Sequence, residues 1–421
     1  MKGVLAVIVF VAFWGLAFPP MKLFDYVQAQ KGKAFWQIEN AGETGNLDSL
    51  EILLLSQTWK GIPWRHRLFL YSPKDPMVRD VVVLYISGDP SPGDSLLCAT
   101  VSSLSRLPVA LLHNVPFQPL FGLREDALIA YTFSQYLETK EPDWPLLFPM
   151  VRSVHAAMEA LEAIFLERWN IPVRGFILIG ASKRGWTTYL AAATAPEKTV
   201  GMVPIVFDMV NIPLQMVHQE RCYGGPSFML SDYAQRGLWL ELGRVPEAAR
   251  LLWLVDPYSY AYAYTMPKLV ILGANDPYWT VDGVNFYWPG LPEPKLLLVV
   301  PNAGHNVLDW TRVIPTIIAF CRLVAEGKPL PKVSVEHRYL EDGLFIRVSE
   351  DWPAKSVALW RAESSSRDFR KARWEETRLS PGEGEVKIDA KQGYQAVFFE
   401  VVFELEGLRA FFSTPPQVVG P

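Results

Sequence analysis

The stretch FILIGASKRG, residues 176–185, decides the fold of this chain. It reads as an apolar strand, a sharp turn that carries Ser182, and the start of an alanine-rich helix. A serine hydroxyl is a weak nucleophile until such a turn exposes it and a base removes its proton. The usual spacing is G-x-S-x-G, but here Arg184 stands where the second glycine is expected. By itself, the segment fits either a variant nucleophile elbow or an ordinary strand-to-helix turn.

Apolar runs typical of strands recur on both sides of this turn. The last six are continuous Val/Ile/Leu stretches, as in strands covered on both faces of a parallel sheet. Helical patterns lie between them, the clearest over residues 150–165. The pattern predicts an α/β-hydrolase fold: an eight-stranded, mostly parallel sheet with helices on both faces, in which Ser182 follows the fifth strand. The expected strands lie near residues 52–58, 67–71, 81–87, 108–113, 175–180, 202–207, 268–273 and 295–300.

The length of 421 residues exceeds the roughly 100–200 residues of one typical domain. We expect an α/β-hydrolase domain over residues 19–330 and a small β-sandwich domain over 331–421, where short β-type runs follow a join marked by Pro329 and Pro331. The strand–helix alternation breaks over about 211–266. That insertion is either a lid or pocket wall, or a helical segment that packs on the body.

The first residues predict export. Met1-Lys2 is followed by an uncharged apolar run over residues 3–18, the pattern of a signal peptide. The run is shorter than the ~20 residues of a spanning helix, and the alternatives are an uncleaved membrane anchor or a buried N-terminal strand. The predicted location is periplasmic, secreted or membrane-tethered. Cys98, Cys222 and Cys321 allow at most one internal disulfide, which an exported protein can form.

Composition excludes several classes of partner. The formal net charge is −4, and the sequence holds no Lys/Arg run and no Cys/His spacing typical of a metal site. We therefore expect no nucleic-acid partner, no cofactor and no metal, and a membrane contact only through an uncleaved N-terminal segment.

A nucleophilic serine requires a base and an acid that orients the base. In the α/β-hydrolase arrangement the acid follows the seventh strand and the histidine follows the eighth. Asp276 and His305 fill these positions in the expected order. His305 would exchange the Ser182 proton, and Asp276 would hold the imidazole tautomer and stabilise the imidazolium. Asp208 and Asp282 are competing acids, and His113 and His218 are weaker candidates for the base that could line a pocket instead.

Negative charge that develops on a tetrahedral intermediate needs backbone donors, each worth roughly 3–4 kcal/mol. The predicted donors are the amide of Lys183, which follows the nucleophile, and those of Gly88 and Asp89 in the loop after the third strand. Pro90 in that loop has no N–H to donate. The Lys183 and Arg184 side chains would either favour an anionic group nearby or form a solvated pair at the helix start.

Aromatic residues crowd the predicted site along the sequence. Trp186 follows the elbow, and Tyr278 and Trp279 follow the acid. With His218 they are weak candidates for substrate binding, suited to a sugar ring or to an apolar or aromatic acyl group. Packing in the core is the alternative.

The chain contains six distinctive motifs: HNVPFQPL (113–120), EDALIAYT (125–132), GASKRGWTT (180–188), FDMVN (207–211), NDPYW (275–279) and RDFR (367–370). Together they resemble the PhoPQ-activated pathogenicity-related protein family. The resemblance runs from about Phe35 to the C-terminus and implies an α/β-hydrolase fold, frequent export and a substrate that is poorly defined. The resemblance implies that G-A-S-K-R-G, with Arg184, is typical of the family. Glucuronoyl esterases have a similar elbow, but that similarity is local.

Two functions follow from these observations. The first is an exported serine hydrolase that cleaves an ester or amide bond through an acyl-enzyme. The second is a non-catalytic secreted or surface protein that binds or signals on a hydrolase fold. The intact set of Ser182, Asp276 and His305 favours the enzyme, because a protein without catalytic constraint would be expected to lose one member.

Overall fold

The structure, a computed structural model, describes residues 21–241, 245–341, 343–379, 385–389 and 393–420. The predicted leader, residues 1–18, lies outside the described residues. Within these ranges, no helix is both long enough and apolar enough to span a bilayer. The chain divides into two compact units: unit 1 is Met1–Pro204 with Ser231–Met266, and unit 2 is Ile205–Leu230 with Pro267–Pro421. The domain boundary expected near residue 330 stays a prediction.

Unit 1 is built on a sheet in the order β1-β2-β3-β5-β4-β6-β7. Strands β1, β2 and β3 form antiparallel pairs, β3 is antiparallel to β5, and β4 lies parallel to both β5 and β6. The strands are β1 (Phe35–Thr44), β2 (Leu47–Trp59), β3 (Ile62–Pro73), β4 (Val81–Ile86), β5 (Val109–Leu112), β6 (Gly175–Ala181) and β7 (Thr199–Ile205).

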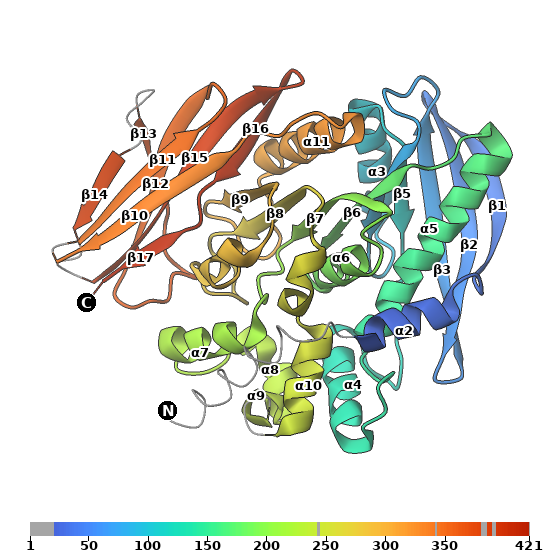
Figure 1. Cartoon of the computed structure of the whole chain (residues 1–421), viewed down its shortest axis with the longest axis horizontal. Helices are drawn as coiled ribbons and strands as arrows, with labels where there is room; N and C mark the ends of the chain where they lie inside the picture. Colours follow the sequence, from blue (N-terminus) through green and yellow to red (C-terminus); the bar gives the residue numbers. More distant parts are fainter. Residues whose placement is uncertain (1–20, 242–244, 342, 380–384, 390–392, 421) are drawn as a thin grey trace. The chain divides into compact units, whose positions relative to one another are not determined.

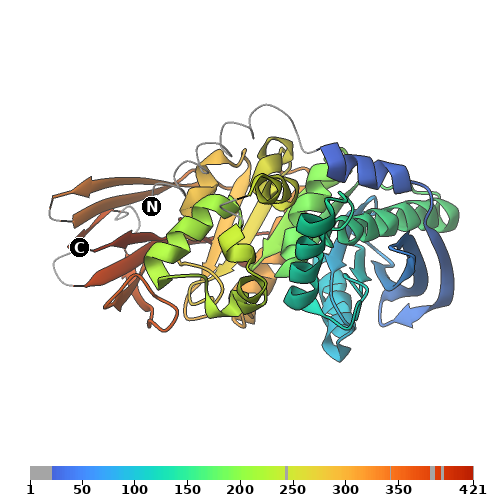
Figure 2. The ribbon, with the colours of Figure 1, turned by 90° about the horizontal axis from the view of Figure 1, so that it is seen from below.

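Helices cover both faces of this sheet. Helices α5 (Leu147–Trp169) and α6 (Lys183–Thr194) lie on one face, and α3 (Pro92–Ser105) lies on the other (Figures 1 and 2). The side chains of β4, β5 and β6 are nearly all buried, which explains their continuous apolar sequences. The remaining helices of unit 1 are α2 (Met21–Gln30), α4 (Glu125–Thr139), α8 (Ser231–Gln235), α9 (Leu238–Glu241), α10 (Pro246–Val255) and the 3-10 helix η2 (Pro257–Ala263).

Unit 2 continues the strand series. The chain that leaves β7 bonds to β8 (Lys268–Gly273), since Val206 N–H donates to the Ile271 carbonyl at 2.8 Å, and β8 pairs in parallel with β9 (Lys295–Val300). The order β2-β3-β5-β4-β6-β7-β8-β9 is that of an α/β-hydrolase fold, so the predicted fold is confirmed. The other elements of this part are α7 (Ile212–Tyr223), α11 (Trp310–Glu326) and the 3-10 helices η1 (Phe228–Leu230), η3 (Gly283–Phe286) and η4 (Trp288–Gly290).

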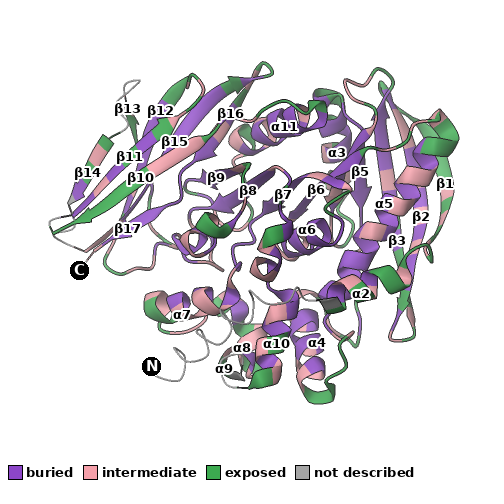
Figure 3. Ribbon diagram, in the orientation of Figure 1, coloured by how far each residue is buried: buried purple, intermediate pink, exposed green. Residues whose placement is uncertain are grey.

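Two antiparallel sheets follow α11 within unit 2. One has the order β10-β11-β14; the other has the order β13-β12-β15-β16, with β17 also paired to β15. Strands β12 and β15 are largely buried, whereas β10 is largely exposed (Figure 3). The strands are β10 (Val333–Leu340), β11 (Gly343–Glu350), β12 (Ser356–Ser364), β13 (Glu375–Leu379), β14 (Glu385–Asp389), β15 (Tyr394–Leu405), β16 (Leu408–Ser413) and β17 (Gln417–Val419).

One strand departs from the expected count of eight. Strand β1 adds an antiparallel ninth member at the edge, and most of its side chains are exposed. Its sequence, FWQIENAGET, carries no buried face and therefore no apolar alternation that would have indicated a strand. The insertion predicted over 211–266 forms α7 to η2, and its role as a lid stays a prediction. All three cysteines are free thiols.

Candidate functional site

In unit 1, Ser182 occupies a strained turn between β6 and α6. Its φ of 57° and ψ of −123° lie outside the regions that a residue other than glycine ordinarily adopts. The turn closes because Gly180 has no side chain: a Cβ there would come within 2.5 Å of the Arg184 carbonyl and 2.7 Å of Thr188 Oγ1. This backbone geometry is the one expected of a nucleophile elbow, and the role of Ser182 as a nucleophile stays a prediction.

Arg184, the residue in place of the second glycine, braces the elbow. Its guanidinium donates two hydrogen bonds to the Glu125 carboxylate, at 2.8 and 2.7 Å, and its Nε donates to the Val115 carbonyl at 2.5 Å. Gly88 lies against the same guanidinium, and a Cβ at this position would overlap it. Arg184 therefore links the elbow to the loops after β4 and β5, and it does not form the solvated pair that was one expectation.

The Lys183 side chain is also paired with carboxylates. Its Nζ lies 3.0 Å from Asp126 and 3.4 Å from Glu125. Although burial raises the pKa of Glu125, its hydrogen bonds to Arg184 and the charges of Arg184 and Lys183 outweigh burial and lower the value to about 2. Both side chains are thus paired with carboxylates, and of the groups of these two residues only the backbone N–H of Lys183 remains a candidate for holding an oxyanion.

The loop after β4 lies beside these groups in unit 1. Asn114 N–H donates to the Gly88 carbonyl at 2.7 Å, which joins this loop to the one after β5. The Asp89 carboxylate accepts from Gln118 Nε2 at 3.2 Å and pairs with Arg124. Since Lys183 is the first residue of α6, its N–H has no acceptor within the helix. The assignment of the Lys183, Gly88 and Asp89 amides to an oxyanion hole stays a prediction.

In unit 2, Asp276 and His305 form a hydrogen-bonded pair. His305 Nδ1 lies 2.7 Å from Asp276 Oδ2, and Asp276 is 4% exposed. Asp276 Oδ1 accepts from Tyr278 N–H at 2.9 Å, which fixes the carboxylate, and the Tyr278 ring lies 4.3 Å from the imidazole ring. Because a carboxylate only accepts, Nδ1 carries the hydrogen and Nε2 is the nitrogen that can take up a proton.

Close packing holds the acid loop and the base loop together. A Cβ at Gly273, the end of β8, would come within 2.6 Å of the Ala303 carbonyl, so only glycine fits there. Asn275 N–H donates to that carbonyl at 2.9 Å. Backbone contacts therefore hold the loops of Asp276 and His305 together, independently of the hydrogen bond between the two side chains.

A C-terminal segment braces the same two loops. Asn275 Nδ2 donates to the Phe369 carbonyl at 3.0 Å and to the Ala372 carbonyl at 2.7 Å. The Asn302 side chain donates to the Trp374 carbonyl at 2.9 Å and accepts from its N–H at 2.8 Å. Sequence reasoning missed these positioning residues, although Asn275 stands directly before the acid.

The two competing acids are engaged elsewhere in unit 2. Asp208 is buried, accepts from Tyr287 O–H at 2.6 Å, and has a pKa raised well above the ordinary value by burial. Asp282 pairs with His218 at 2.6 Å and with Arg367 at 2.9 Å. Among the three carboxylates considered, Asp276 is the one that contacts His305.

The predicted aromatic residues are largely used in packing. Trp186 is 7% exposed, and its Nε1–H donates to the Val255 carbonyl at 2.6 Å. Trp279 Nε1–H donates to the Val206 carbonyl at 3.1 Å. Tyr278 lies beside His305, whereas His218 belongs to the Asp282 cluster and His113 is a buried histidine whose pKa burial lowers. Of these residues, Tyr278 is therefore the one placed against the acid–base pair.

A serine–histidine contact lies in the core of unit 1. Ser56 Oγ is 2.9 Å from His66 Nε2 and 3.3 Å from Ser153 Oγ. Ser56 and His66 are 0% and 1% exposed, and burial lowers the pKa of His66 to about 4. A neutral pair with no exposed surface satisfies buried polar groups and offers no access to a substrate.

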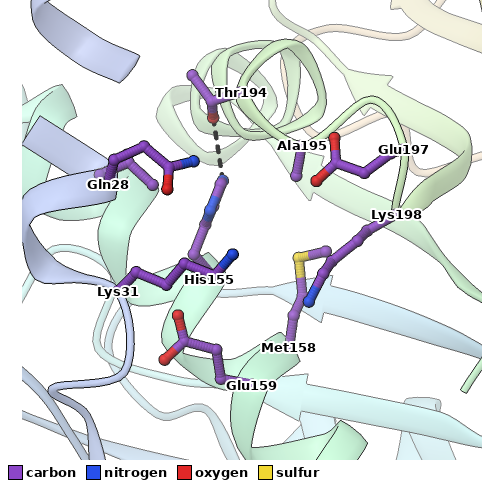
Figure 4. A pocket seen from close by; sticks show the side chains of 10 residues that line it. Gln28, Lys31, His155, Met158, Glu159, Thr194, Ala195, Glu197 and Lys198 are labelled. Atoms are coloured by element: carbon purple, nitrogen blue, oxygen red, sulfur yellow. Dashed lines mark hydrogen bonds between the residues drawn. The ribbon is translucent and has the colours of Figure 1, made fainter. Parts of the chain in front are cut away.

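A further histidine of unit 1 lines a small cavity. Figure 4 shows this cavity of about 30 Å³, in which His155 Nε2 lies 3.0 Å from Thr194 Oγ1. Burial lowers the pKa of His155 to about 3. The space suits a water molecule rather than a substrate.

The strand order, the strained serine turn and the buried acid–histidine pair together define a protein of the α/β-hydrolase fold. Residues 23–370 match the PhoPQ-activated pathogenicity-related protein family, and the chain belongs to this family. It is 33% identical over 379 residues to autocrine proliferation repressor protein A of Dictyostelium discoideum, an alignment that covers 83% of this chain and 76% of that protein.

Solved structures of low sequence identity align with parts of the chain. An acetyl xylan esterase from Paenibacillus sp. R4 aligns with a TM-score of 0.49 and 14% identity over 73% of this chain and 93% of that chain. Acetyl xylan esterase 1 from Thermoanaerobacterium sp. JW/SL YS485 aligns with a TM-score of 0.47 and 12% identity over 68% and 86%.

Proposed function

We propose that this protein is an exported serine hydrolase that cleaves an ester or amide bond through an acyl-enzyme. The observation that carries the proposal is the hydrogen bond of 2.7 Å between buried Asp276 and His305 Nδ1. This contact stabilises an imidazolium and leaves Nε2 to exchange a proton. The strained elbow at Ser182 and membership of a family with the α/β-hydrolase fold support it.

In the proposed reaction, Ser182 Oγ gives its proton to His305 Nε2 and attacks the carbonyl carbon of the substrate. The carbonyl electron pair moves to oxygen, and the amides of Lys183, Gly88 and Asp89 stabilise the oxyanion. Collapse of the intermediate breaks the bond to the leaving group, which takes the proton from Nε2. Water, deprotonated by the same nitrogen, then releases the acyl group as a carboxylic acid and restores Ser182.

A fluorophosphonate probe tests the nucleophile directly. We expect the wild-type protein to form a phosphonyl adduct on Ser182, located by mass spectrometry, and Ser182→Ala to form none. Ser56→Ala is the matched control, because Ser56 Oγ lies 2.9 Å from His66 Nε2 in the core of unit 1 and its loss should leave labelling intact. Folded wild type that stays unlabelled would refute the proposal, as would labelling lost in Ser56→Ala and kept in Ser182→Ala.

Export is a separate part of the proposal, supported by the charged start and the apolar run over residues 3–18. The full-length chain, expressed in its own host, should be recovered outside the cytoplasm. N-terminal sequencing of that material distinguishes a cleaved signal peptide from an anchor that is retained. Recovery of the protein in the cytosolic fraction alone would contradict export.

A second candidate is a secreted signalling protein without catalysis. The relative of 33% identity carries the name autocrine proliferation repressor protein A, and this resemblance favours the alternative. The experiment adds purified wild-type protein, Ser182→Ala or His305→Ala to proliferating cells of the producing organism. Repression of growth that is equal for all three proteins would favour signalling, whereas repression lost in both variants would favour the hydrolase.

A further inference from the structure

A cluster of three metal-ligating side chains lies in unit 2, outside the acid–base pair. His218 and Cys222 stand four residues apart on α7, and such residues share one face of a helix. Asp282 comes from the loop before η3. The ligand atoms are the imidazole nitrogen, the thiol sulfur and a carboxylate oxygen, and all three lie within 4.8 Å of one another.

The contacts in this cluster meet at one atom. His218 Nε2 lies 2.6 Å from Asp282 Oδ1, and the same Nε2 lies 3.4 Å from Cys222 Sγ. A Cys–His–Asp proton relay would use opposite nitrogens of the ring, as His305 does with Asp276 on Nδ1. Since both partners approach Nε2, the cluster does not have the arrangement of a catalytic triad. Nitrogen, sulfur and oxygen ligands that converge are the arrangement of a transition-metal site.

The distances fit a small divalent ion. Around tetrahedral Zn²⁺, with Zn–S of ~2.3 Å and Zn–N of ~2.0–2.1 Å, neighbouring ligand atoms lie roughly 3.3–3.6 Å apart. The sulfur–nitrogen distance of 3.4 Å is already in this range. The nitrogen–oxygen distance of 2.6 Å is that of a hydrogen bond, and it would lengthen when an ion replaces the shared proton.

Neighbouring groups orient the ligands as they do around known metal sites. Arg367 Nη2 donates to Asp282 Oδ2 at 2.9 Å, which leaves Oδ1 directed at His218. The Phe286 ring lies 4.7 Å from the His218 ring and restricts its rotation. His218 and Asp282 are 6% and 9% exposed, so surrounding protein atoms hold both ligands in place. Outer contacts of this kind typically set the orientation of metal ligands.

An access path leads to the cluster. His218 and Asp282 line a cavity of about 520 Å³, whose walls also include Arg221, Asn285, Tyr339 and Gln417. That volume lies in the range of small-molecule sites, about 300–1,000 Å³. Zinc sites that bind a water molecule or an exogenous ligand typically have three protein ligands and a fourth coordination position that opens to a cavity.

We propose that His218, Cys222 and Asp282 bind one divalent transition-metal ion of the Zn²⁺ class, with its fourth position open to this cavity. The thiolate and carboxylate would balance the two charges of the ion. The sequence predicted no metal, because His and Cys four residues apart are not a zinc-finger signature and Asp282 lies far along the chain. The proposed ligands do not include Ser182, Asp276 or His305, so the proposal does not rest on the hydrolase activity.

Metal uptake by the full chain tests the proposal. The protein is stripped with a chelator, dialysed, reloaded with Zn²⁺ or Co²⁺, and analysed for metal content and absorbance. We expect one ion per chain and, with Co²⁺, a thiolate-to-metal charge-transfer band. Cys222→Ser should abolish the band and weaken binding by more than about 100-fold, beyond the 10–100-fold typical for loss of an outer-shell partner. Cys321→Ser, which removes a buried free thiol of α11, is the control and should keep both.

A second measurement uses only the wild-type protein, so it tests metal binding even if a variant fails to fold. Cys222 is only half-buried, so iodoacetamide in alkaline buffer, which favours the thiolate, should alkylate it in the stripped protein, and Zn²⁺ should suppress this reaction at least about 10-fold. Cys98 and Cys321 are buried and provide internal references in the same mass spectrum. Folded wild type that binds no Zn²⁺ at micromolar concentration, or a Cys222→Ser variant that binds it with unchanged affinity, would overturn the proposal.

Discussion

Replacing Asp276 with asparagine tests the acid–base pair with the least change in shape. Asp276 Oδ1 accepts from Tyr278 N–H at 2.9 Å, and an asparagine oxygen can keep that bond. The side-chain NH₂ then faces His305 Nδ1, which lies 2.7 Å from Oδ2 in the native protein. An amide donor there requires Nδ1 to accept, so the ring hydrogen moves to Nε2. The imidazole can then no longer take up the Ser182 proton.

The expected loss follows from this change of tautomer. A wrong tautomer with the geometry intact lowers kcat by about 10⁴-fold in serine hydrolases, or roughly 5.5 kcal/mol at 1.36 kcal/mol per tenfold. Folding stability should change by less than about 1 kcal/mol, because the carboxamide fills the same space and keeps the Tyr278 contact. A large loss of rate with little loss of stability is therefore the expected signature.

The assay is hydrolysis of p-nitrophenyl acetate and butyrate, with the rate of fluorophosphonate labelling as a second readout that needs no natural substrate. Asp208→Asn is the matched control, since Asp208 is also a buried aspartate of unit 2 but bonds Tyr287 at 2.6 Å. Its rate should stay within about tenfold of wild type, one step of 1.36 kcal/mol. An Asp276→Asn variant as active as wild type, or an equal loss in both variants, would refute the assignment of Asp276 as the orienting acid.

Three further predictions concern stability. Gly180→Ala should destabilise the fold by about 1–3 kcal/mol in urea unfolding, because its Cβ would lie 2.5 Å from the Arg184 carbonyl. The control Gly93→Ala has open space around its Cβ and should not lower the stability in this way. Equal urea midpoints for the two variants would count against close packing at the Ser182 turn. The pKa of Glu125 is lowered from 4.5 to about 2 in the folded protein, so its ionised form stabilises the fold above pH 4.5 and this contribution is lost as the pH falls to about 2. In Glu125→Gln the free energy of unfolding should therefore fall less than in wild type over this pH range, and parallel curves for the two proteins would disprove this. Burial lowers the pKa of Lys268 from 10.5 to about 7, so between these pH values the unfolded chain binds more protons than the folded protein and the free energy of unfolding should rise with pH. Lys268→Met should remove this rise, and a rise equal to that of wild type would contradict the prediction.

The sequence predicted those parts of the site that depend on position after a strand. Ser182, Asp276 and His305 lie in the turns after β6, β8 and β9, so the order of apolar runs was enough to place them there; their catalytic roles stay predictions. The eight expected strands all form for the same reason. Strand β1 was missed because its side chains are mostly exposed and its pairing with β2, not a buried face, makes it a strand.

The rest of the site depends on partners that are remote in the sequence. The sequence left two roles open for the Arg184 side chain, and only the fold supplies Glu125, Val115 and Gly88 around its guanidinium. Asn275 and Asn302 carry no motif of their own, because their function comes from backbone groups near residue 370. Side-chain pairing across loops has no period along the chain, and sequence patterns therefore cannot indicate it.

The brace formed by Asn275 and Asn302 has a consequence for how the chain can be divided. Residues 369–374 supply the backbone groups that hold both the acid loop and the base loop of unit 2. A protein cut after α11 would retain Asp276 and His305 but lose four hydrogen bonds that fix their loops. Replacing the C-terminal sheets with those of a relative would therefore also change the contacts that position Asp276 and His305.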